Sequence, residues 1–235
     1  MENQDFSYID RNLAEIRARM EAAAKRSGKG NAPRLLVASK YATAEEMNYA
    51  AALGVEMFGE NRVPSLLEKY DALDKSAELH FIGSLQTNKV KSIIGKVSLI
   101  HSLDSLRLAE AIEKHSASAG VVTDVLCEIN SGREPQKGGI MPEDFPAFAE
   151  KISGFSHINL RGLMTMAPNC ENIEDYRKYF KETYNIFIDF FQKKPHNIGS
   201  YAKMPILSMG MSQSFEIAIS EGANLVRVGR AVFQK

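Results

Sequence analysis

The sequence predicts a single (β/α)8 barrel of the TIM type, an α/β fold in which parallel strands alternate with helices and close into a ring. Three observations support this prediction. Short apolar runs alternate with longer amphipathic segments along the chain, which is the pattern of parallel βαβ units. Eight such runs are present. The 235 residues fit one barrel and contain no linker rich in Pro, Gly or Ser, so we expect one domain over residues 1–235.

The elements follow in order from this pattern. A long amphipathic helix is expected over 6–28 and ends in the stretch from Gly28 to Pro33. The first strand is expected at 35–39, and the next helix begins at Thr43, where residues 43–46 resemble a capping box. The other strands are expected at 55–58, 79–82, 97–101, 123–129, 157–163, 205–208 and 224–228. The helices between them are expected near 62–73, 86–95, 104–119, 143–153, 172–193 and 212–221. A doubly wound open sheet shows the same alternation and is the second candidate.

Composition excludes several classes of function. Lys plus Arg and Asp plus Glu both number 29, so the net charge of zero argues against binding nucleic acid by bulk electrostatics. Cys127 and Cys170 stand alone, without a CxxC or a His/Cys cluster, which argues against a disulfide framework or a metal site. The polar N-terminus does not resemble a signal peptide, and no apolar run approaches the roughly 18 residues of a membrane span. We expect a soluble cytoplasmic protein.

Lys40 is the first candidate functional residue, because it follows directly on the first expected strand. In a barrel, active-site groups gather at the rim where the strands end. The small residues Ala38 and Ser39 precede it, so the amine could be partly desolvated and nucleophilic. A solvated lysine just beyond a strand is the other interpretation.

Two loops at the same rim predict an anion site. The stretch 207–213, after the seventh strand, combines hydroxyls, a glycine and the start of a helix, whose N–H groups favour an anion. Simple N-capping of the helix by Ser212 is the other interpretation. The stretch 226–231 closes the eighth strand, and Gly229 allows close backbone approach. Barrels frequently form a phosphate site from the loops after strands seven and eight.

Arg227 lies among apolar residues of the eighth strand, so its guanidinium is expected to face the barrel mouth and to need a partner. A structural salt bridge with a glutamate is the other interpretation. The stretches 58–62 and 80–89 place further polar groups at this rim. The remaining histidines show no metal spacing and are expected at the surface or satisfied in the core; they are His101, His115, His157 and His196.

Six ordered motifs give the chain a specific resemblance from about residue 8 to its end. They are VASK at 37–40, FGEN at 58–61, HFIGSLQTNK at 80–89, GLMTMA at 162–167, LSMGMS at 207–212 and VRVGRAVF at 226–233. These motifs resemble those of the pyridoxal phosphate homeostasis proteins, which are single-domain relatives of the N-terminal barrel of alanine racemase. The resemblance implies a cytoplasmic protein of vitamin B6 homeostasis that binds pyridoxal 5′-phosphate (PLP).

The resemblance also implies a role for each matching residue. Lys40 would carry PLP covalently as a Schiff base, and Arg227 would face the pyridine nitrogen. The phosphate would be held by Ser212 with backbone N–H groups around Met211, Gly229 and Arg230, in a pocket that Ser208 lines. The ring would be surrounded less directly by Asn61, His80 and Met164. A permanently charged arginine disfavours protonation of the ring nitrogen and weakens PLP as an electron sink.

The chain departs from the family pattern at three places. Ser214 stands where family members often carry an acidic residue, and Arg230 replaces a frequent small hydroxyl residue. The chain ends in FQK instead of a glycine. The change at Ser214 puts little in doubt, whereas Arg230 could contact the phosphate through its side chain as well as its backbone.

Three functions fit these residues. The first is a non-catalytic carrier, with no catalytic residue and no metal, which binds PLP and other B6 vitamers and contacts PLP-dependent apo-enzymes transiently. We expect it to be a monomer, because the second domain that supplies the acid/base tyrosine of alanine racemase across a dimer has no counterpart here. The second is an amino-acid racemase or a related fold-type III PLP enzyme, with Tyr41 or His80 as the second acid. The third is a cofactor-free Schiff-base aldolase acting on a phosphorylated sugar.

Overall fold

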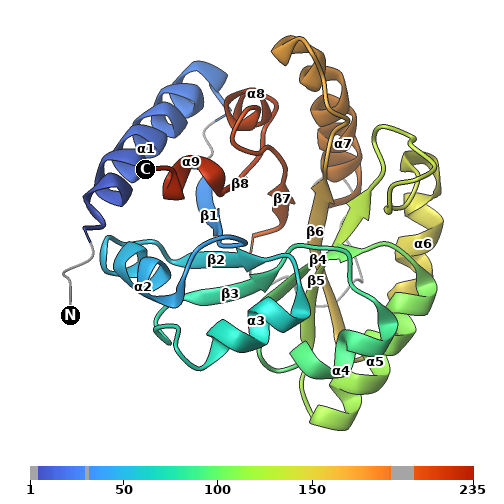
Figure 1. Ribbon diagram of the computed structural model, residues 1–235. Coiled ribbons are helices and arrows are strands. Elements are labelled where there is room, and N and C mark those ends of the chain that lie inside the picture. Colours follow the sequence, from blue (N-terminus) through green and yellow to red (C-terminus); the bar gives the residue numbers. More distant parts are fainter. Residues whose placement is uncertain (1–4, 30–31, 192–203) are drawn as a thin grey trace.

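The computed structural model, which describes residues 5–29, 32–191 and 204–235, is a closed barrel of parallel strands in the order β1 to β8 (Figure 1). The last strand pairs with the first, with Leu36 opposite Arg227. This closure confirms the predicted (β/α)8 barrel and excludes the open sheet. The strands are β1 (Arg34–Ala38), β2 (Met57–Glu60), β3 (Glu78–Phe81), β4 (Leu99–Leu103), β5 (Thr123–Ile129), β6 (Ile158–Thr165), β7 (Ile206–Ser208) and β8 (Leu225–Val228).

The helices form the outer layer of the barrel (Figure 1). They are α1 (Ser7–Ser27), α2 (Ala44–Ala52), α3 (Val63–Tyr70), α4 (Val90–Ile93), α5 (Leu106–Ala119), α6 (Phe145–Ile152), α7 (Tyr176–Phe191), α8 (Phe215–Ser220) and α9 (Arg230–Phe233). The predicted capping box is present: Thr43 Oγ1 accepts from the Glu46 N–H, and the Thr43 N–H donates to Glu46 Oε2. Gly28 ends α1 in the left-handed conformation, with a φ of 63°.

Several expected elements differ in the structure. The segment expected as one helix over 86–95 is a 3₁₀ turn (Thr87–Lys89) followed by the single turn of α4. Strand β2 begins two residues later than expected, because the Val55 N–H still bonds the Ala50 carbonyl at the end of α2. Helix α8 begins at Phe215 and not at 212, and α9 was not expected. Residues 192–193 of the helix expected over 172–193 lie outside the described residues.

The interior of the barrel contains two small apolar clusters, of which one comprises Leu36, Met57, Ile82 and Leu225 and the other Leu99, Leu126 and Met164. The larger apolar cluster fills the layer between strands and helices. Helix α1 packs against α8 and α9, which follow β7 and β8 (Figure 1). The Asn12 side chain of α1 donates to the carbonyls of Val232 and Gln234. Helix α1 therefore supports the segment of chain that closes the barrel.

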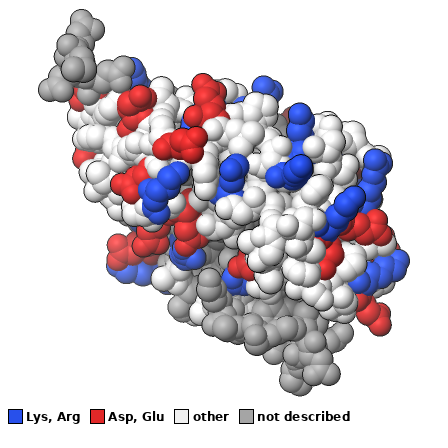
Figure 2. Space-filling model, turned by 90° about the horizontal axis from the view of Figure 1, so that it is seen from below, with Lys and Arg blue, Asp and Glu red and all other residues white. Residues whose placement is uncertain are grey.

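The surface carries both signs of charge. Positive and negative side chains intermingle over the face of the molecule in Figure 2, in keeping with the net charge of zero. Among residues 5–29, 32–191 and 204–235, no helix is long and apolar enough to cross a membrane.

Candidate functional site

The two ends of the barrel differ, and we call them the upper and lower mouths. The upper mouth is where the strands end and includes Lys40, Asn61 and Gly229; the lower mouth is where the strands begin and includes Arg34 and Glu78. In barrels of this kind, ligands bind at the upper mouth, whereas the lower mouth contributes mainly to stability.

The backbone in front of Lys40 is fixed by a buried group of polar side chains. The Ser39 N–H bonds the Gly59 carbonyl at 3.0 Å, and Ser39 Oγ donates to Glu60 Oε1 at 2.8 Å. Lys69 Nζ of α3 donates to the Ser39 carbonyl at 2.8 Å and to Glu60 Oε1 at 2.7 Å. The Glu60 side chain is 1% exposed and that of Lys69 is 12% exposed, so this clamp of Ser39, Glu60 and Lys69 holds the end of β1 to β2 and α3.

The Lys40 side chain is exposed at the upper mouth, so the expectation that its amine is partly desolvated was wrong. The reason is that Lys40 lies beyond the end of β1, where its Nζ faces the ring of Tyr41 at 4.7 Å from the centroid. Tyr41 itself is 78% exposed. A hydrogen bond to Lys40, together with the lysine charge, lowers the pKa of the Tyr41 hydroxyl.

Gly229 brings the loop after β8 against the end of β1. A Cβ atom at Gly229 would lie 2.6 Å from the Ala38 carbonyl oxygen and 3.0 Å from the Ala38 Cβ, so only glycine fits without a shift. Because Ala38 is two residues before Lys40, this approach places the start of α9 beside the lysine. Arg230, the first residue of α9, is exposed.

The loop after β7 is a compact turn between Gly210 and α8. Gly210 has a φ of 91°, and a Cβ there would lie 2.5 Å from the Ala218 Cβ. The Met211 N–H donates to Ser214 Oγ at 3.2 Å, and Ser214 rather than Ser212 is the N-cap residue of α8. The Ser212 hydroxyl has no hydrogen bond within the described residues, so the interpretation of Ser212 as a helix cap was wrong.

A pocket of about 600 Å³ opens between these two loops and the end of β6. Met211, Ser212 and Arg230 line it, together with Met166 and Lys137. The structure therefore brings together three members of the predicted phosphate site. Lys40, Asn61 and Gly229 are not among the lining residues, although Gly229 directly precedes Arg230.

Arg227 points into the barrel and is 4% exposed. Its Nη1 donates to the carbonyl and the Oγ of Ser208, at 2.9 and 2.7 Å, and its Nη2 donates to the Thr165 carbonyl at 3.0 Å. No carboxylate forms an ion pair with Arg227 in the described part of the chain, so the salt-bridge interpretation was wrong. Burial lowers the pKa of the guanidinium to about 10, while the charge of Glu128 opposes this effect.

Glu128 was not predicted as a site residue. Its carboxylate is the acidic group whose charge acts on Arg227. Burial, with the nearby Asp104, raises the pKa of the Glu128 carboxyl to about 7, and Arg227 counteracts part of that rise. The signal in the sequence was its spacing: Glu128 is two residues after Leu126 on the same strand, so both side chains point to the same face, into the barrel.

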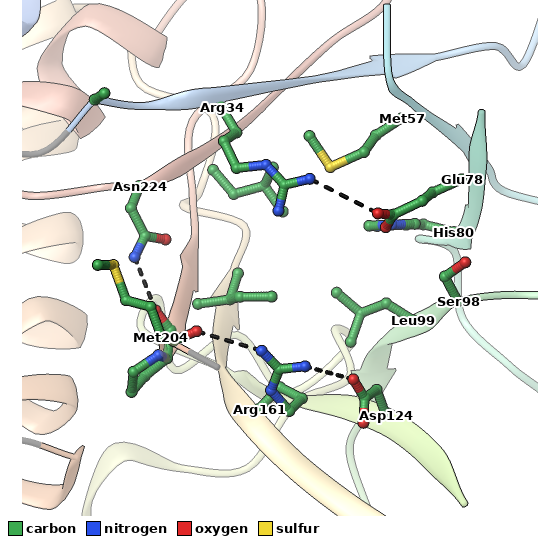
Figure 3. A pocket seen from close by; sticks show the side chains of 14 residues that line it. Arg34, Met57, Glu78, His80, Ser98, Leu99, Asp124, Arg161, Met204 and Asn224 are labelled. Atoms are coloured by element: carbon green, nitrogen blue, oxygen red, sulfur yellow. Dashed lines mark hydrogen bonds and ion pairs between the residues drawn. The ribbon is translucent and has the colours of Figure 1, made fainter. Parts of the chain in front are cut away.

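His80 lies deeper than the resemblance implied. It is the third residue of β3 and is 2% exposed, and its side chain lines a pocket of about 520 Å³ at the lower mouth, together with Arg34 and Arg161 (Figure 3). Its Nδ1 lies 3.0 Å from His101 Nε2, and its Nε2 lies 3.1 Å from Glu78 Oε2. His80 therefore lies below the upper mouth: it is a middle residue of β3 and points into the barrel, opposite to its neighbours Leu79 and Phe81, which pack in the outer apolar cluster.

The remaining predicted residues, Met164 and Asn61, lie in the half of the barrel nearer the upper mouth. Met164 is 1% exposed and pairs in register with Ser208 across β6 and β7. Asn61 is half-buried directly after β2, where its carbonyl oxygen leaves no room for a side chain at Gly83.

His101 confirms one of the two expectations for the remaining histidines, because it is a satisfied core residue: it is fully buried in β4, and its Nδ1 lies 3.2 Å from Ser208 Oγ. Its contacts with His80 and Ser208 were not predicted. Burial, with His80 and Arg227 nearby, holds the pKa of His101 well below its usual value. The available signal was that His80 and His101 both lie within neighbouring strands.

Comparison with known proteins shows which family has this arrangement. The family model described as "Alanine racemase, N-terminal domain" matches residues 9–234. A pyridoxal phosphate homeostasis protein of Aquifex aeolicus is 43% identical over 223 residues, which cover 94% of this chain and 95% of the relative. The chain belongs to the pyridoxal phosphate homeostasis protein family. The family member of Pseudomonas aeruginosa is 34% identical, with 97% of this chain and 96% of the relative covered.

Solved structures give the same result for the fold of this family. A protein of unknown function from Bifidobacterium adolescentis has a TM-score of 0.91 at 30% identity, with 99% of this chain and 97% of the other covered. PipY of Synechococcus elongatus, solved with PLP bound, has a TM-score of 0.80 at 27% identity over 96% and 99% of the two chains. Alanine racemase of Clostridium difficile is 16% identical over 58% of its own chain, with a TM-score of 0.68, and shares the fold alone.

Proposed function

We propose that the protein is a non-catalytic PLP carrier of vitamin B6 homeostasis in the cytoplasm. It holds PLP as a Schiff base on Lys40 and supplies it to PLP-dependent apo-enzymes. The observation that carries this proposal is the approach of Gly229 to Ala38, because it brings the loop after β8, a candidate phosphate loop, close to Lys40, which lies two residues beyond the end of β1. The names of the relatives and the PLP bound to PipY support the choice of cofactor.

The residues of the upper mouth fit the chemical groups of PLP. The Ser212 hydroxyl and the N–H groups around Met211, Gly229 and Arg230 would hold the phosphate, although the Met211 N–H itself donates to Ser214 Oγ. Ser208 Oγ accepts a hydrogen bond from Arg227. The buried Arg227 fits the pyridine nitrogen, with Asn61 and Met164 beside the ring. PLP supplies an aldehyde that condenses with an amine and a ring that withdraws electrons.

The character of Arg227 supports a carrier more than a catalyst. With a pKa of about 10, its guanidinium stays charged at neutral pH, so a ring nitrogen beside it stays unprotonated. An unprotonated ring is a weaker electron sink, which restricts the chemistry at Cα of an amino acid. Holding and releasing PLP requires no such sink.

The chain covers 95% of the Aquifex aeolicus protein and 58% of the alanine racemase chain. We propose that residues 1–235 act as one domain and as a monomer, and that their partners are PLP, other B6 vitamers and apo-enzymes in transient contact.

Borohydride reduction followed by peptide mass spectrometry tests the Schiff base. We expect one phosphopyridoxyl group, on Lys40, and none in Lys40→Arg, which keeps the charge but has no primary amine. A group on another lysine of the wild-type protein would refute the assignment. For delivery, we expect the loaded protein to restore activity to a PLP-dependent apo-enzyme faster than the same low concentration of free PLP does, and equal rates would contradict it.

An amino-acid racemase is the second candidate, because the exposed Tyr41 hydroxyl lies beside Lys40 and has a lowered pKa. Racemisation requires a proton-transfer group on each face of the substrate, and Lys40 and Tyr41 could form such a pair. His80 does not suit this role, since it is buried and bonded below the upper mouth. Rapid exchange of the alanine Cα proton in D₂O that is lost in Tyr41→Phe would favour the racemase over the carrier.

A further inference from the structure

A continuous chain of polar side chains crosses the interior of the barrel from one mouth to the other. From the upper end, Arg227 Nη1 lies 2.7 Å from Ser208 Oγ, and Ser208 Oγ lies 3.2 Å from His101 Nδ1. His101 Nε2 lies 3.0 Å from His80 Nδ1, and His80 Nε2 lies 3.1 Å from Glu78 Oε2 at the lower mouth. Four strands contribute to the chain: β8, β7, β4 and β3. Apolar side chains of the two inner clusters flank it.

The charges at the two ends fix the direction of every hydrogen bond between them. Arg227 has only donors, so Ser208 Oγ accepts from it. Glu78 is 49% exposed, and a solvent-facing carboxylate is ionised at neutral pH and only accepts, so His80 Nε2 carries a proton. At a pH where an imidazole carries a single proton, His80 Nδ1 then accepts from His101 Nε2. A neutral His101 accepts at Nδ1, so the Ser208 hydroxyl donates to it.

The surroundings of the His101 ring favour its neutral form. His101 is fully buried between His80 and Arg227, and its lowered pKa keeps the ring uncharged. Arg34 is not part of this series of hydrogen bonds, but it orients the Glu78 carboxylate: its Nη2 lies 3.9 Å from Glu78 Oε1 (Figure 3). When hydrogen bonds follow one another in the same direction, each polarises the next, and this strengthens all of them.

We propose that Glu78, His80 and His101 are positioning residues of the cofactor site, which act through Ser208 on Arg227 and couple the lower mouth of the barrel to the ring nitrogen of PLP. This inference rests on the proposed function for the identity of the ligand. With its proton directed to His101, the Ser208 hydroxyl presents its lone pairs to Arg227 and fixes the guanidinium plane. The lower mouth thereby takes part in cofactor binding, although none of its residues contacts the cofactor.

The first experiment tests the direction of the chain without any cofactor. Nitrogen-15 NMR of histidine-labelled protein at pH 8, where imidazole is neutral, reports which ring nitrogen carries the proton. We expect His80 and His101 to be protonated at Nε2 alone. In Glu78→Gln the terminal amide can donate as well as accept, so both rings should become mixtures of tautomers. A proton on Nδ1 of either ring in the wild-type protein would overturn the proposal.

The second experiment measures coupling to the cofactor site. Glu56 is the matched control for Glu78, because its side chain also pairs with Arg34, at 3.8 Å, whereas the hydrogen bonds of His80 within the described residues go to His101 and Glu78. We expect Glu78→Gln to raise the Kd for PLP about twofold to tenfold, the range of one intramolecular hydrogen bond, and to shift the absorbance maximum of bound PLP. Glu56→Gln should change neither. Equal effects of the two variants would contradict the proposal.

A double-mutant cycle tests whether the effect passes through His101. In a His101→Leu background the chain is already broken, so adding Glu78→Gln should not raise the Kd further. Effects that simply add would refute transmission through His101. If His101→Leu does not fold, the tautomers of the wild-type protein still decide the direction of the chain. Absence of PLP binding by the wild-type protein would refute the proposed function, and the tautomers would show separately whether the chain itself is correct.

Discussion

At the residue scale, the interior of this barrel stabilises a buried cation with neutral groups. Arg227 loses its hydration and donates three hydrogen bonds instead, to the Ser208 hydroxyl and to the carbonyls of Ser208 and Thr165. The sequence indicated that Arg227 points inward, because its neighbours in β8 are apolar. It did not indicate these partners, because carbonyl groups carry no residue-specific signal.

Glu128 should make the stability of the protein fall as pH rises. Its folded-state pKa of about 7 lies above the ordinary value of 4.5, so over that interval the folded protein keeps a proton that the unfolded chain releases. In urea unfolding without PLP, Glu128→Gln should match the wild type at pH 5 and exceed it by roughly 2–3 kcal/mol at pH 8. Glu150→Gln, on the exposed surface of α6, is the control and should show no such difference. A gap at pH 5 as large as that at pH 8 would exclude this explanation.

Among the helices and strands, two sets of hydrogen bonds fix the segments that follow β1 and β8 at the upper mouth. The clamp of Ser39, Glu60 and Lys69 ties β1 to β2 and α3. On the other side, Asn12 of α1 holds the carbonyls at the end of α9. Both contacts lie outside the barrel, so they stabilise the site without touching a ligand.

Removing the lysine of the clamp should be costly. Lys69→Met leaves Glu60 buried without its cation, and breaking a buried pair in this way costs about 3–5 kcal/mol. Lys25→Met is the matched control, because Lys25 pairs with Glu21 on the exposed face of α1 and should cost less than about 1 kcal/mol. Chemical denaturation of the two variants tests this difference. Similar losses would show that the clamp contributes no more than a surface pair.

The contact between α1 and α9 should affect PLP affinity. Asn12→Ala removes the hydrogen bonds to the end of α9, at a cost of about 1 kcal/mol, and loosens the segment that starts beside Gly229. We expect faster amide hydrogen exchange in α9 and weaker PLP binding. Asn48→Ala removes comparable bonds between α2 and residues 72–74, and it should leave PLP binding unchanged. Unchanged exchange in α9 after Asn12→Ala would show that this support is unnecessary.

At the scale of the whole molecule, one closed barrel combines a polar upper mouth with a lower mouth of mixed charge. Arg34 and Arg161 at the lower mouth face Glu78 and Asp124, as Figure 3 shows. Ring closure makes each strand depend on both neighbours, so a ligand at the upper mouth stabilises the entire barrel and not a single loop.

PLP should therefore raise the melting temperature of the complete protein. At a concentration about 100 times its Kd, a ligand that binds only the folded state adds about 2.7 kcal/mol, which corresponds to about 5–10 °C for a domain of this size. We expect this shift in the wild-type protein and a much smaller one in Lys40→Arg. An equal shift in both would mean that PLP stabilises the protein without the bond to Lys40.

The sequence was sufficient for features that depend on local pattern. Apolar periodicity and turn residues gave the strands and most helices, and the motif at Thr43 gave a cap that the structure contains. It was insufficient where boundaries depend on packing, as at the starts of β2 and α8. A strand or helix extends only as far as neighbouring residues provide hydrogen-bond and packing partners.

Periodicity along the chain favoured the closed barrel over the open sheet, and the motifs indicated the family and the position of Lys40 after the first strand. Three facts required the folded structure: Lys40 is exposed, Gly229 approaches Ala38, and Arg227 is joined to Glu78 through Ser208, His101 and His80. The physical reason is that these facts join residues of different strands. Their distances and burial exist only after the ring has closed and the inward side chains have met.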